Sequence, residues 1–292
     1  MKRVEREYHV LGTGIGFGEG PVWRSGTQDL VFCSLSTARV LRWSAAEGIT
    51  TLARLPAGGA NGLAEGPDGR LYLAQTGGSH PHAPAPLDCR AAGGVQVIDH
   101  AGRVEWVTLA PFEPNDLCFG PDGWIYVTDP TRPVKRRDAR LWHCNVETGE
   151  AQLLTSVDYF ANGIAFDAAG DLFVANTSDG TILRYPLRDG QLGEPSVAIR
   201  MDHNVPDGIA FDMNGNLLIA SVSWTSDPGD VQVWAPDGSP VECFRVGNAK
   251  KVTNLAISGD RTLYVTTGDS EELIRVPNWP AGPLPLFPFR AG

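Results

Sequence analysis

The sequence GPDGRLYLA at residues 66–74 returns almost unchanged as GPDGWIYVT at residues 120–128, each a glycine-rich turn followed by a short apolar strand. Looser copies of the same pattern are AAGDLFVAN at 168–176, MNGNLLIAS at 213–221, SGDRTLYVT at 258–266 and an imperfect first copy, SGTQDLVFCS, at 25–34. A turn of glycine or aspartate next to β-branched and aromatic residues is typical of tight β-hairpins. The chain is therefore expected to be a series of repeated hairpins.

A second short strand precedes each copy, and it begins with a residue that is polar in every copy. We call these six first residues the head residues: Glu19, Asn61, Asn115, Asn162, Asp207 and Thr253. Successive head residues are about 42 to 54 positions apart, close to the period of a β-propeller blade with its four strands. Six such units fill nearly all of the 292 residues. The predicted fold class is all-β, a single six-bladed β-propeller domain over residues 1–292 with four-stranded blades.

Other folds are disfavoured by the same pattern. No stretch of helical length has a period of 3.6 residues, which argues against α/β folds. The WD dipeptide is absent, which argues against a WD40 array. We expect the N-terminal segment Glu5–Leu11 to close the ring as the outer strand beside Glu272–Pro277, so that the sheet array has no free edge.

The amino-acid composition limits which kinds of binding partner this chain can have. The chain has 24 basic and 34 acidic residues and a net charge of −10, which argues against nucleic acid or an anionic membrane as partner. No apolar run approaches the roughly 20 residues of a membrane span, and the N-terminus does not resemble a signal peptide. The five cysteines are scattered and contain no CxxC pair, which indicates a reduced, cytoplasmic protein. We expect a monomer or a homodimer.

In a propeller the first strand of each blade lines the central channel, so the head residues are expected to converge on the axis. Five of the six are carboxylates or amides. Buried carboxylates without partners are unfavourable, so a cation or a network of water is needed between them. Oxygen ligands suit a hard divalent metal. The competing interpretation is that Asn-Gly and Asp-Gly merely form turns.

These residues resemble the SMP-30/gluconolactonase/luciferin-regenerating-like family of six-bladed propellers, which is related to diisopropylfluorophosphatase and paraoxonase. The segments that carry the resemblance are GEGPVW at 18–23, PNDLCFGPDGWIYVTDP at 114–130, ANGIAFD at 161–167, VPDGIAFDMNGNLLIAS at 205–221, and TNLAI with RTLYVT within 253–266. They span nearly the whole chain.

The resemblance implies a site with one divalent metal ion bound by Glu19, Asn162 and Asp207. It implies that Asn115 either contacts substrate or joins the metal ligands, and that Asp207 also acts as general base or nucleophile. The resemblance does not identify the metal, which could be Ca²⁺, Mg²⁺, Mn²⁺, Zn²⁺ or Fe²⁺. Members related to the animal protein carry an arginine two residues before the Asn115 position, where this chain has Glu113.

The expected activity is that of a metal-dependent hydrolase that opens a small-molecule lactone, such as a sugar acid lactone, or a related cyclic ester. The metal would polarise the carbonyl, and Asp207 would assist water attack. One alternative is a binding or sensing propeller with a structural Ca²⁺. Another is a metal-dependent enzyme of a specialised biosynthetic pathway. The fold alone does not choose between them.

Further substrate contacts are sought on the loops at the channel mouth and among the remaining head residues. Residues 76–94 form a long loop and a candidate lid. The candidate substrate-binding residues are Asn61, Asn115, His80, His82, Arg132 and Trp224. Arg132 belongs to a basic cluster with Lys135, Arg136 and Arg137 that is either a solvated face or a means of steering an anion. His203 is a candidate neighbour of Asp207.

Overall fold

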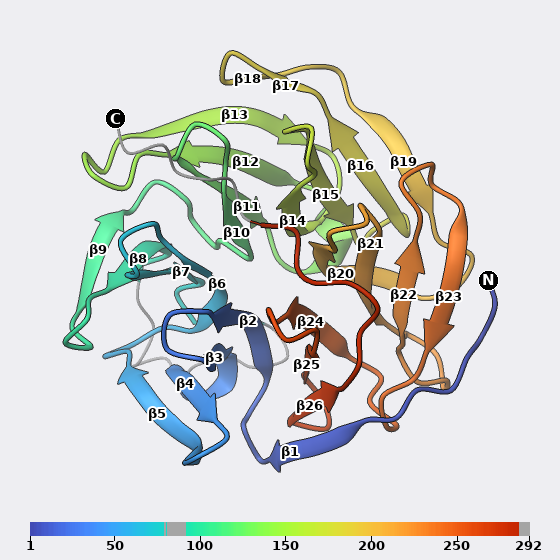
Figure 1. Ribbon diagram of the computed structural model, residues 1–292. Helices are drawn as coiled ribbons and strands as arrows, with labels where there is room; N and C mark the ends of the chain where they lie inside the picture. The colour runs from blue at the N-terminus through green and yellow to red at the C-terminus, as the bar shows by residue number, and fades with distance from the viewer. Residues whose placement is uncertain (79, 81–91, 286–292) are drawn as a thin grey trace.

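The computed structural model describes residues 1–78, 80 and 92–285. In this part of the chain, six four-stranded antiparallel sheets surround a central axis as the blades of a propeller (Figure 1). The predicted all-β, six-bladed fold is therefore confirmed. The described chain also contains the small hairpin of β17 (Leu187–Arg188) and β18 (Gln191–Leu192) and two short 3₁₀ helices, η1 (Leu35–Thr37) and η3 (Val134–Arg136).

The strands of the first three blades follow one another from the axis outward. Blade 1 consists of β2 (Gly18–Arg24), β3 (Asp29–Ser34), β4 (Arg39–Ser44) and β5 (Gly48–Arg54). Blade 2 consists of β6 (Ala60–Glu65), β7 (Leu71–Gln75), β8 (Gly94–Ile98) and β9 (Val104–Thr108). Blade 3 consists of β10 (Leu117–Phe119), β11 (Ile125–Pro130), β12 (Ala139–Cys144) and β13 (Ala151–Val157).

The other three blades repeat this order. Blade 4 consists of β14 (Ala161–Phe166), β15 (Leu172–Asn176), β16 (Thr181–Tyr185) and β19 (Ser196–Arg200). Blade 5 consists of β20 (Val205–Phe211), β21 (Leu217–Val222), β22 (Val231–Trp234) and β23 (Pro240–Phe244). Blade 6 consists of β24 (Val252–Ile257), β25 (Leu263–Thr267), β26 (Glu272–Val276) and, from the other end of the chain, β1 (His9–Thr13).

Strand β1 closes the ring, as predicted, because it pairs with β26 with His9 opposite Arg275 and Thr13 opposite Glu272. It begins four residues later than the expected Glu5–Leu11. The reason is a contact with blade 5: the Val4 amide donates to the Cys243 carbonyl at 2.9 Å, and the Cys243 amide donates to the Lys2 carbonyl at 2.8 Å. The residues between Val4 and His9 carry the chain from blade 5 to blade 6.

The hydrophobic core lies between the blades, and the sequence repeat builds it. An aromatic residue on the second strand of one blade packs against an aromatic residue on the first strand of the next blade. These pairs are Tyr72 with Phe119, Tyr126 with Phe166, Phe173 with Phe211, and Tyr264 with Trp23, with ring centroids 5.3, 4.9, 5.0 and 5.5 Å apart. Beyond the burial of its area, such a pair contributes about 0.5–1.5 kcal/mol. The repeated strands therefore also hold these four pairs of neighbouring blades together.

Two further observations bear on the sequence predictions. None of the helices that the structure describes is long and apolar enough to cross a membrane. Four of the cysteines are free thiols, namely Cys33, Cys118, Cys144 and Cys243. The fifth, Cys89, lies outside the described residues.

Candidate metal centre and substrate site

The head residues lie at the inner end of each blade, where the first strand leaves its regular pairing. The β-ladder shifts register beside five of them, between Glu19 and Val22, Ala60 and Leu63, Ala161 and Ile164, Pro206 and Ile209, and Val252 and Asn254. Such β-bulges redirect side chains and are frequent beside active sites. In blade 3, Asn115 and Asp116 precede the strand and instead bond to the backbone of Thr128.

Glycine follows four of the head residues, and it allows the blades to approach closely at the axis. A Cβ atom added to Gly62 would lie 2.6 Å from the Cα atom of Asp116, and one added to Gly208 would overlap the side chain of Asn254. Blades 3 and 6 carry a larger residue after the head, namely Asp116 and Asn254. These two side chains come from opposite blades and fill the space that the glycines leave at the axis.

Three buried carboxylates therefore share the channel: Glu19, Asp116 and Asp207 are only 5%, 8% and 8% exposed. Burial raises the pKa of Glu19 well above its ordinary value, and the charges of Asp207 and Asp116 raise it further. Burial, followed by the charge of Asp116, raises the pKa of Asp207 to about 8. The pKa of Asp116 is about 6, again chiefly because of burial. Like charges in a low-dielectric site repel one another unless a cation lies between them.

Amide groups interact with these carboxylates. Hydrogen bonding from Asn162 lowers the pKa of Asp207, and hydrogen bonding from Asn254 lowers those of Glu19 and Asp116. The Asn162 side-chain nitrogen also donates to the Thr177 hydroxyl at 3.1 Å. Carboxylate and amide oxygens at one buried place fit a hard divalent cation.

The other three head residues differ in what they contact. Asn61 donates through its side-chain nitrogen to Asn115 Oδ1 at 3.1 Å. Asn61 Oδ1 is buried and has no hydrogen-bond partner among the described residues. Thr253 donates through its hydroxyl to the Gly18 carbonyl at 2.6 Å, which ties blade 6 to blade 1. Thr253 thus contributes to the structure of the ring, and Asn61 and Asn115 are joined to each other by their side chains.

Arg132 lies beside this centre, unlike the rest of the basic cluster predicted in its loop. It is 9% exposed, and the charges of Glu113, Asp129, Glu19 and Asp207 all act on it. Arg137 pairs at the surface with Asp179, its Nη1 2.6 Å from Asp179 Oδ1, while Lys135 and Arg136 are exposed.

The remaining candidate residues have other surroundings. His80 packs against Phe17, two residues before Glu19, with ring centroids 5.1 Å apart. Trp224 lies in the loop between β21 and β22 and is 56% exposed. His82, with most of the candidate lid, lies outside the described residues. His203 contacts Asp230 and Asp202 and not Asp207, so the expected contact with the channel is not observed.

His203 belongs to a cluster that sequence reasoning missed. His203, Asp230 and Cys243 each place one potential ligand atom within 4.8 Å of the others. However, His203 Nε2 lies 2.7 Å from Asp230 Oδ2, and its Nδ1 bonds to Asp202. Burial lowers the pKa of His203, while hydrogen bonds to Asp230 and Asp202 raise it above its ordinary value overall. This pattern is typical of an ion pair that supports blade 5.

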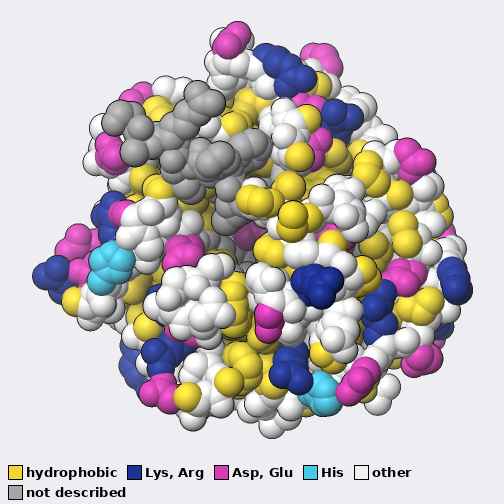
Figure 2. Space-filling view, viewed as in Figure 1, with side chains coloured by type: hydrophobic (Ala, Val, Ile, Leu, Met, Phe, Trp, Pro, Cys, Tyr) yellow, Lys and Arg dark blue, Asp and Glu magenta, His cyan; other side chains and the backbone are white. Residues whose placement is uncertain are grey.

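The structure contains two hollows whose walls include none of the six head residues. A cavity of about 500 Å³ opens at the end of the channel where the first strands of the blades finish, and its walls include Phe119, Phe166 and Phe211 and, next to the head residues, Asp116 and Asn254. The C-terminal residues Pro283 and Leu284 run across this end, where the Leu284 amide donates to the Phe211 carbonyl (Figure 1). Figure 2 shows hydrophobic side chains around the central hollow on the same face.

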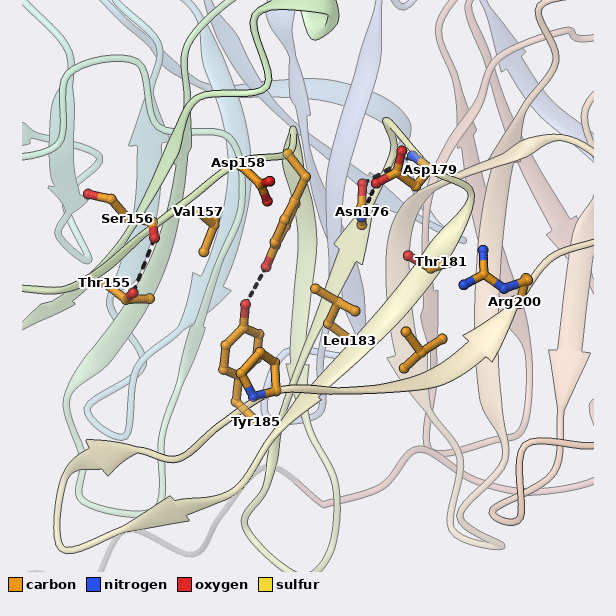
Figure 3. A pocket seen from close by; sticks show the side chains of 13 residues that line it. Thr155, Ser156, Val157, Asp158, Asn176, Asp179, Thr181, Leu183, Tyr185 and Arg200 are labelled. Carbon is orange, nitrogen blue, oxygen red and sulfur yellow. Dashed lines mark hydrogen bonds between the residues drawn. The ribbon is translucent and has the colours of Figure 1, made fainter.

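The second hollow is a groove of about 690 Å³ between the outer strands of blades 3 and 4 (Figure 3). Its floor contains the hydrogen bond between the Tyr159 and Tyr185 hydroxyls at 2.7 Å, and Asn176 bonds to Asp179 at its edge. Several of its polar groups are thus already hydrogen-bonded within the protein. The buried acids with raised pKa values lie at the head residues, which makes the channel the better candidate for chemistry.

Comparisons with known proteins agree with this fold. A family model described as the SMP-30/gluconolactonase/LRE-like region matches residues 17–269. A gluconolactonase of Zymomonas mobilis is 24% identical over 94% of this chain and 82% of its own length. A pentonolactonase of Haloferax volcanii is 25% identical over 90% of this chain and 85% of its own. The crystal structure of a calcium-binding protein, regucalcin, from Agrobacterium tumefaciens has a TM-score of 0.78 at 19% identity, covering 97% of this chain and 99% of that one.

Proposed function

This chain belongs to the SMP-30/gluconolactonase/LRE-like family, and from that premise we propose that it is a divalent-metal-dependent lactonase. The observation that carries the proposal is the group of buried acids at and beside the head residues: burial raises the pKa values of Glu19 and Asp207, and the charge of Asp116 raises both further. Relatives that are named gluconolactonase and pentonolactonase support a lactone of a sugar acid as substrate.

Glu19, Asn162 and Asp207 are the residues that would hold the ion, with Asp116 and Asn254 behind them. When bound, a divalent cation polarises a lactone carbonyl and stabilises the negative charge that develops on its oxygen. A calcium-binding regucalcin among the similar structures supports Ca²⁺ as the first ion to test.

Asp207 is the general base in this proposal. One of its carboxylate oxygens accepts a proton from water as the water oxygen attacks the carbonyl carbon. When the ring C–O bond breaks, Asp207 returns the proton to the departing alkoxide, and the product is the open hydroxy acid. Arg132 and Lys251 oppose the effect of burial by lowering the pKa of Asp207, which favours the ionised form that a base needs.

The test is acid release from a panel of aldono-, γ- and δ-lactones, followed with a pH indicator and with each divalent metal added to stripped protein. Asp207→Asn removes the base and one carboxylate ligand, and should reduce turnover by at least about a hundredfold. Asp227→Asn is the matched control, because Asp227 lies in an exposed loop of the same blade. Metal binding without turnover of any lactone would contradict the proposal and favour a binding or sensing propeller.

A further inference from the structure

Three side chains of different metal-binding types meet on blade 5, outside the group of head residues. His203 lies in the loop before β20, Asp230 directly precedes β22, and Cys243 lies on β23. One potential ligand atom of each lies within 4.8 Å of the other two. Ligand atoms on a tetrahedral zinc ion are roughly 3.3–3.6 Å apart, so small side-chain rotations suffice to bring all three onto one ion.

Asp230 is buried, and its carboxylate is held so that one oxygen stays beside the imidazole of His203. Three groups donate to its Oδ1: the Ser221 hydroxyl at 2.5 Å and the side-chain nitrogens of Asn204 and Gln232, each at 3.2 Å. Among the described residues, Oδ2 bonds to His203 alone, at 2.7 Å. Oδ2 is therefore the oxygen that can bind an ion while Oδ1 keeps the carboxylate in place.

His203 is oriented as metal-binding histidines usually are. Its Nε2 faces Asp230, and its Nδ1 bonds to a carboxylate oxygen of Asp202. A histidine that binds a metal through one ring nitrogen almost always donates the N–H of the other to a carboxylate, a carbonyl or water. The side chain of His203 is 34% exposed, so an ion can reach Nε2 from solvent.

Gln232 supplies an independent sign that an ion belongs in this group. Its side chain is fully buried, and its Oε1 has no hydrogen-bond donor among the described residues. Its Nε2 lies 3.3 Å from His203 Nε2. Both ring nitrogens of His203 face carboxylates and so carry protons, which means that two donors meet there. A half turn of the amide with a metal ion in place of the imidazole proton gives Oε1 a partner and removes this conflict.

The thiol of Cys243 decides which ion fits. Burial, followed by the charge of Asp230, raises the pKa of this thiol, whereas a hydrogen bond and the charge from Arg3 lower it. The thiolate is the form that binds metals, and a divalent ion beside the sulfur favours it. Thiolate, imidazole and carboxylate together suit Zn²⁺, whereas Ca²⁺ and Mg²⁺ prefer oxygen ligands alone.

We propose that His203 Nε2, Asp230 Oδ2 and Cys243 Sγ bind a structural Zn²⁺ ion on blade 5. The fourth ligand is Gln232 Oε1, which completes the closed tetrahedral set that structural zinc sites have. Binding forms bonds from zinc to one nitrogen, two oxygens and one sulfur. The protons of His203 Nε2 and of the Cys243 thiol leave to solvent. This site is separate from the channel ion and does not depend on the proposed function.

The position of Cys243 indicates what the ion stabilises. The Cys243 amide donates to the Lys2 carbonyl, and the Val4 amide donates to the Cys243 carbonyl. The N-terminal segment thus runs along β23 before it reaches the ring-closing strand β1 (Figure 1). An ion on Cys243 joins β23 to the loop before β20 and strengthens the strand on which this segment is anchored.

Cobalt(II) tests the site directly, because it takes the place of zinc and absorbs in the near ultraviolet when a thiolate binds it. The full-length protein is stripped of metal, kept reduced with a phosphine rather than a thiol, and titrated with Co²⁺. The wild type should develop this absorption at about one ion per chain, and Zn²⁺ should abolish it while excess Ca²⁺ should not. Cys243→Ser should not develop it. Cys144→Ser, which also removes a buried thiol, should behave as the wild type.

A second variant keeps the test valid if Cys243→Ser does not fold. Asp202→Ala removes the carboxylate that orients His203, and the Asp202 side chain is 58% exposed, so the fold is not at risk. Its affinity for Zn²⁺, measured by competition with a chelator, should fall by about 10- to 100-fold. Asp227→Ala removes an exposed aspartate of the same blade and should leave the affinity unchanged.

The outcomes separate this site from the channel. Asp207→Asn should keep the cobalt absorption, and Zn²⁺ should raise its Tm as it raises that of the wild type, because an ion that binds the folded state stabilises it. Loss of the absorption in Asp207→Asn would assign the ion to the channel and overturn the proposal. So would absorption that persists in Cys243→Ser, unchanged zinc affinity in Asp202→Ala, or wild-type protein that develops no absorption. None of these results bears on whether the channel opens a lactone.

Discussion

The Asn162 side-chain nitrogen donates to Thr177 Oγ1 at 3.1 Å, and the Thr177 hydroxyl donates to the Pro206 carbonyl at 2.7 Å. Pro206 directly precedes Asp207, so one hydroxyl links a head residue of blade 4 to the head of blade 5. The link fixes which way the Asn162 amide faces. If Asn162 is a metal ligand, its oxygen is free for the ion because its nitrogen is engaged elsewhere.

Thr177→Val should therefore weaken metal binding without removing any ligand. Partners of metal ligands typically contribute about 10- to 100-fold to affinity. Titration of metal-stripped protein by calorimetry measures the change. Thr148→Val, in an exposed turn of blade 3, is the control. Equal affinities for the Thr177 variant and the wild type would show that Asn162 does not depend on this link.

The stability of the metal-stripped protein should fall as the pH rises. The pKa values of Asp116 and Asp207 are about 6 and about 8 in the folded protein, against about 3.9 in an unfolded chain. Between pH 4 and 8 the folded state thus holds more protons than the unfolded state, so each unit of pH removes up to about 1.4 kcal/mol of stability per excess proton. Tm values at pH 5, 6, 7 and 8 should decline, and saturating divalent metal should abolish the decline. A Tm that does not change with pH in stripped protein would contradict the electrostatic account of the site.

Asp116→Asn should reduce the loss of stability with rising pH in the metal-stripped protein. The substitution removes a charge that raises the pKa values of Glu19 and Asp207. The metal-stripped variant should be more stable than stripped wild type at pH 8, and metal binding should release fewer protons. Calorimetry in two buffers of different ionisation enthalpy measures the protons released. Asp189→Asn, an exposed aspartate, should change neither quantity.

Much of this molecule could be predicted from its sequence because the signals are local. A hairpin copy such as residues 120–128 contains its turn, its strand and the aromatic residue that packs on the next blade. The head residues Glu19, Asn162 and Asp207 stand out because polar residues recur at the start of otherwise apolar strands. The blade count and the ring closure follow from this repetition.

The features that the sequence did not predict depend on contacts between distant segments. Arg132 was a candidate substrate-binding residue, but its burial against Glu113 was not predicted, because the sequence does not distinguish it from the exposed basic residues beside it. The sequence does contain a signal for the presence of Asp116 and Asn254 at the axis, because these two residues replace the glycine that follows the other head residues. The start of β1 could not be predicted, since it depends on the contact between Val4 and Cys243 across two blades.

Gly62→Ala should destabilise the fold, because the added Cβ would lie 2.6 Å from the Cα atom of Asp116 and the backbone must move. Overpacking of this kind typically reduces the free energy of unfolding by about 1–3 kcal/mol. Denaturant unfolding of Gly62→Ala should be compared with that of Gly26→Ala, where the added atom has no neighbour within 4 Å. Equal midpoints would mean that blades 2 and 3 are not closely packed at the axis.

The central claim is that the acids of the channel hold a divalent ion that is needed to open a lactone. The most direct measurement is the rate of acid release from D-glucono-1,5-lactone by metal-stripped protein, before and after Ca²⁺ or another divalent metal is added. We predict a rate no higher than the spontaneous reaction in stripped protein, recovery with metal, and no recovery in Asp207→Asn. Full turnover by thoroughly stripped protein, or recovery in Asp207→Asn equal to the wild type, would contradict the account.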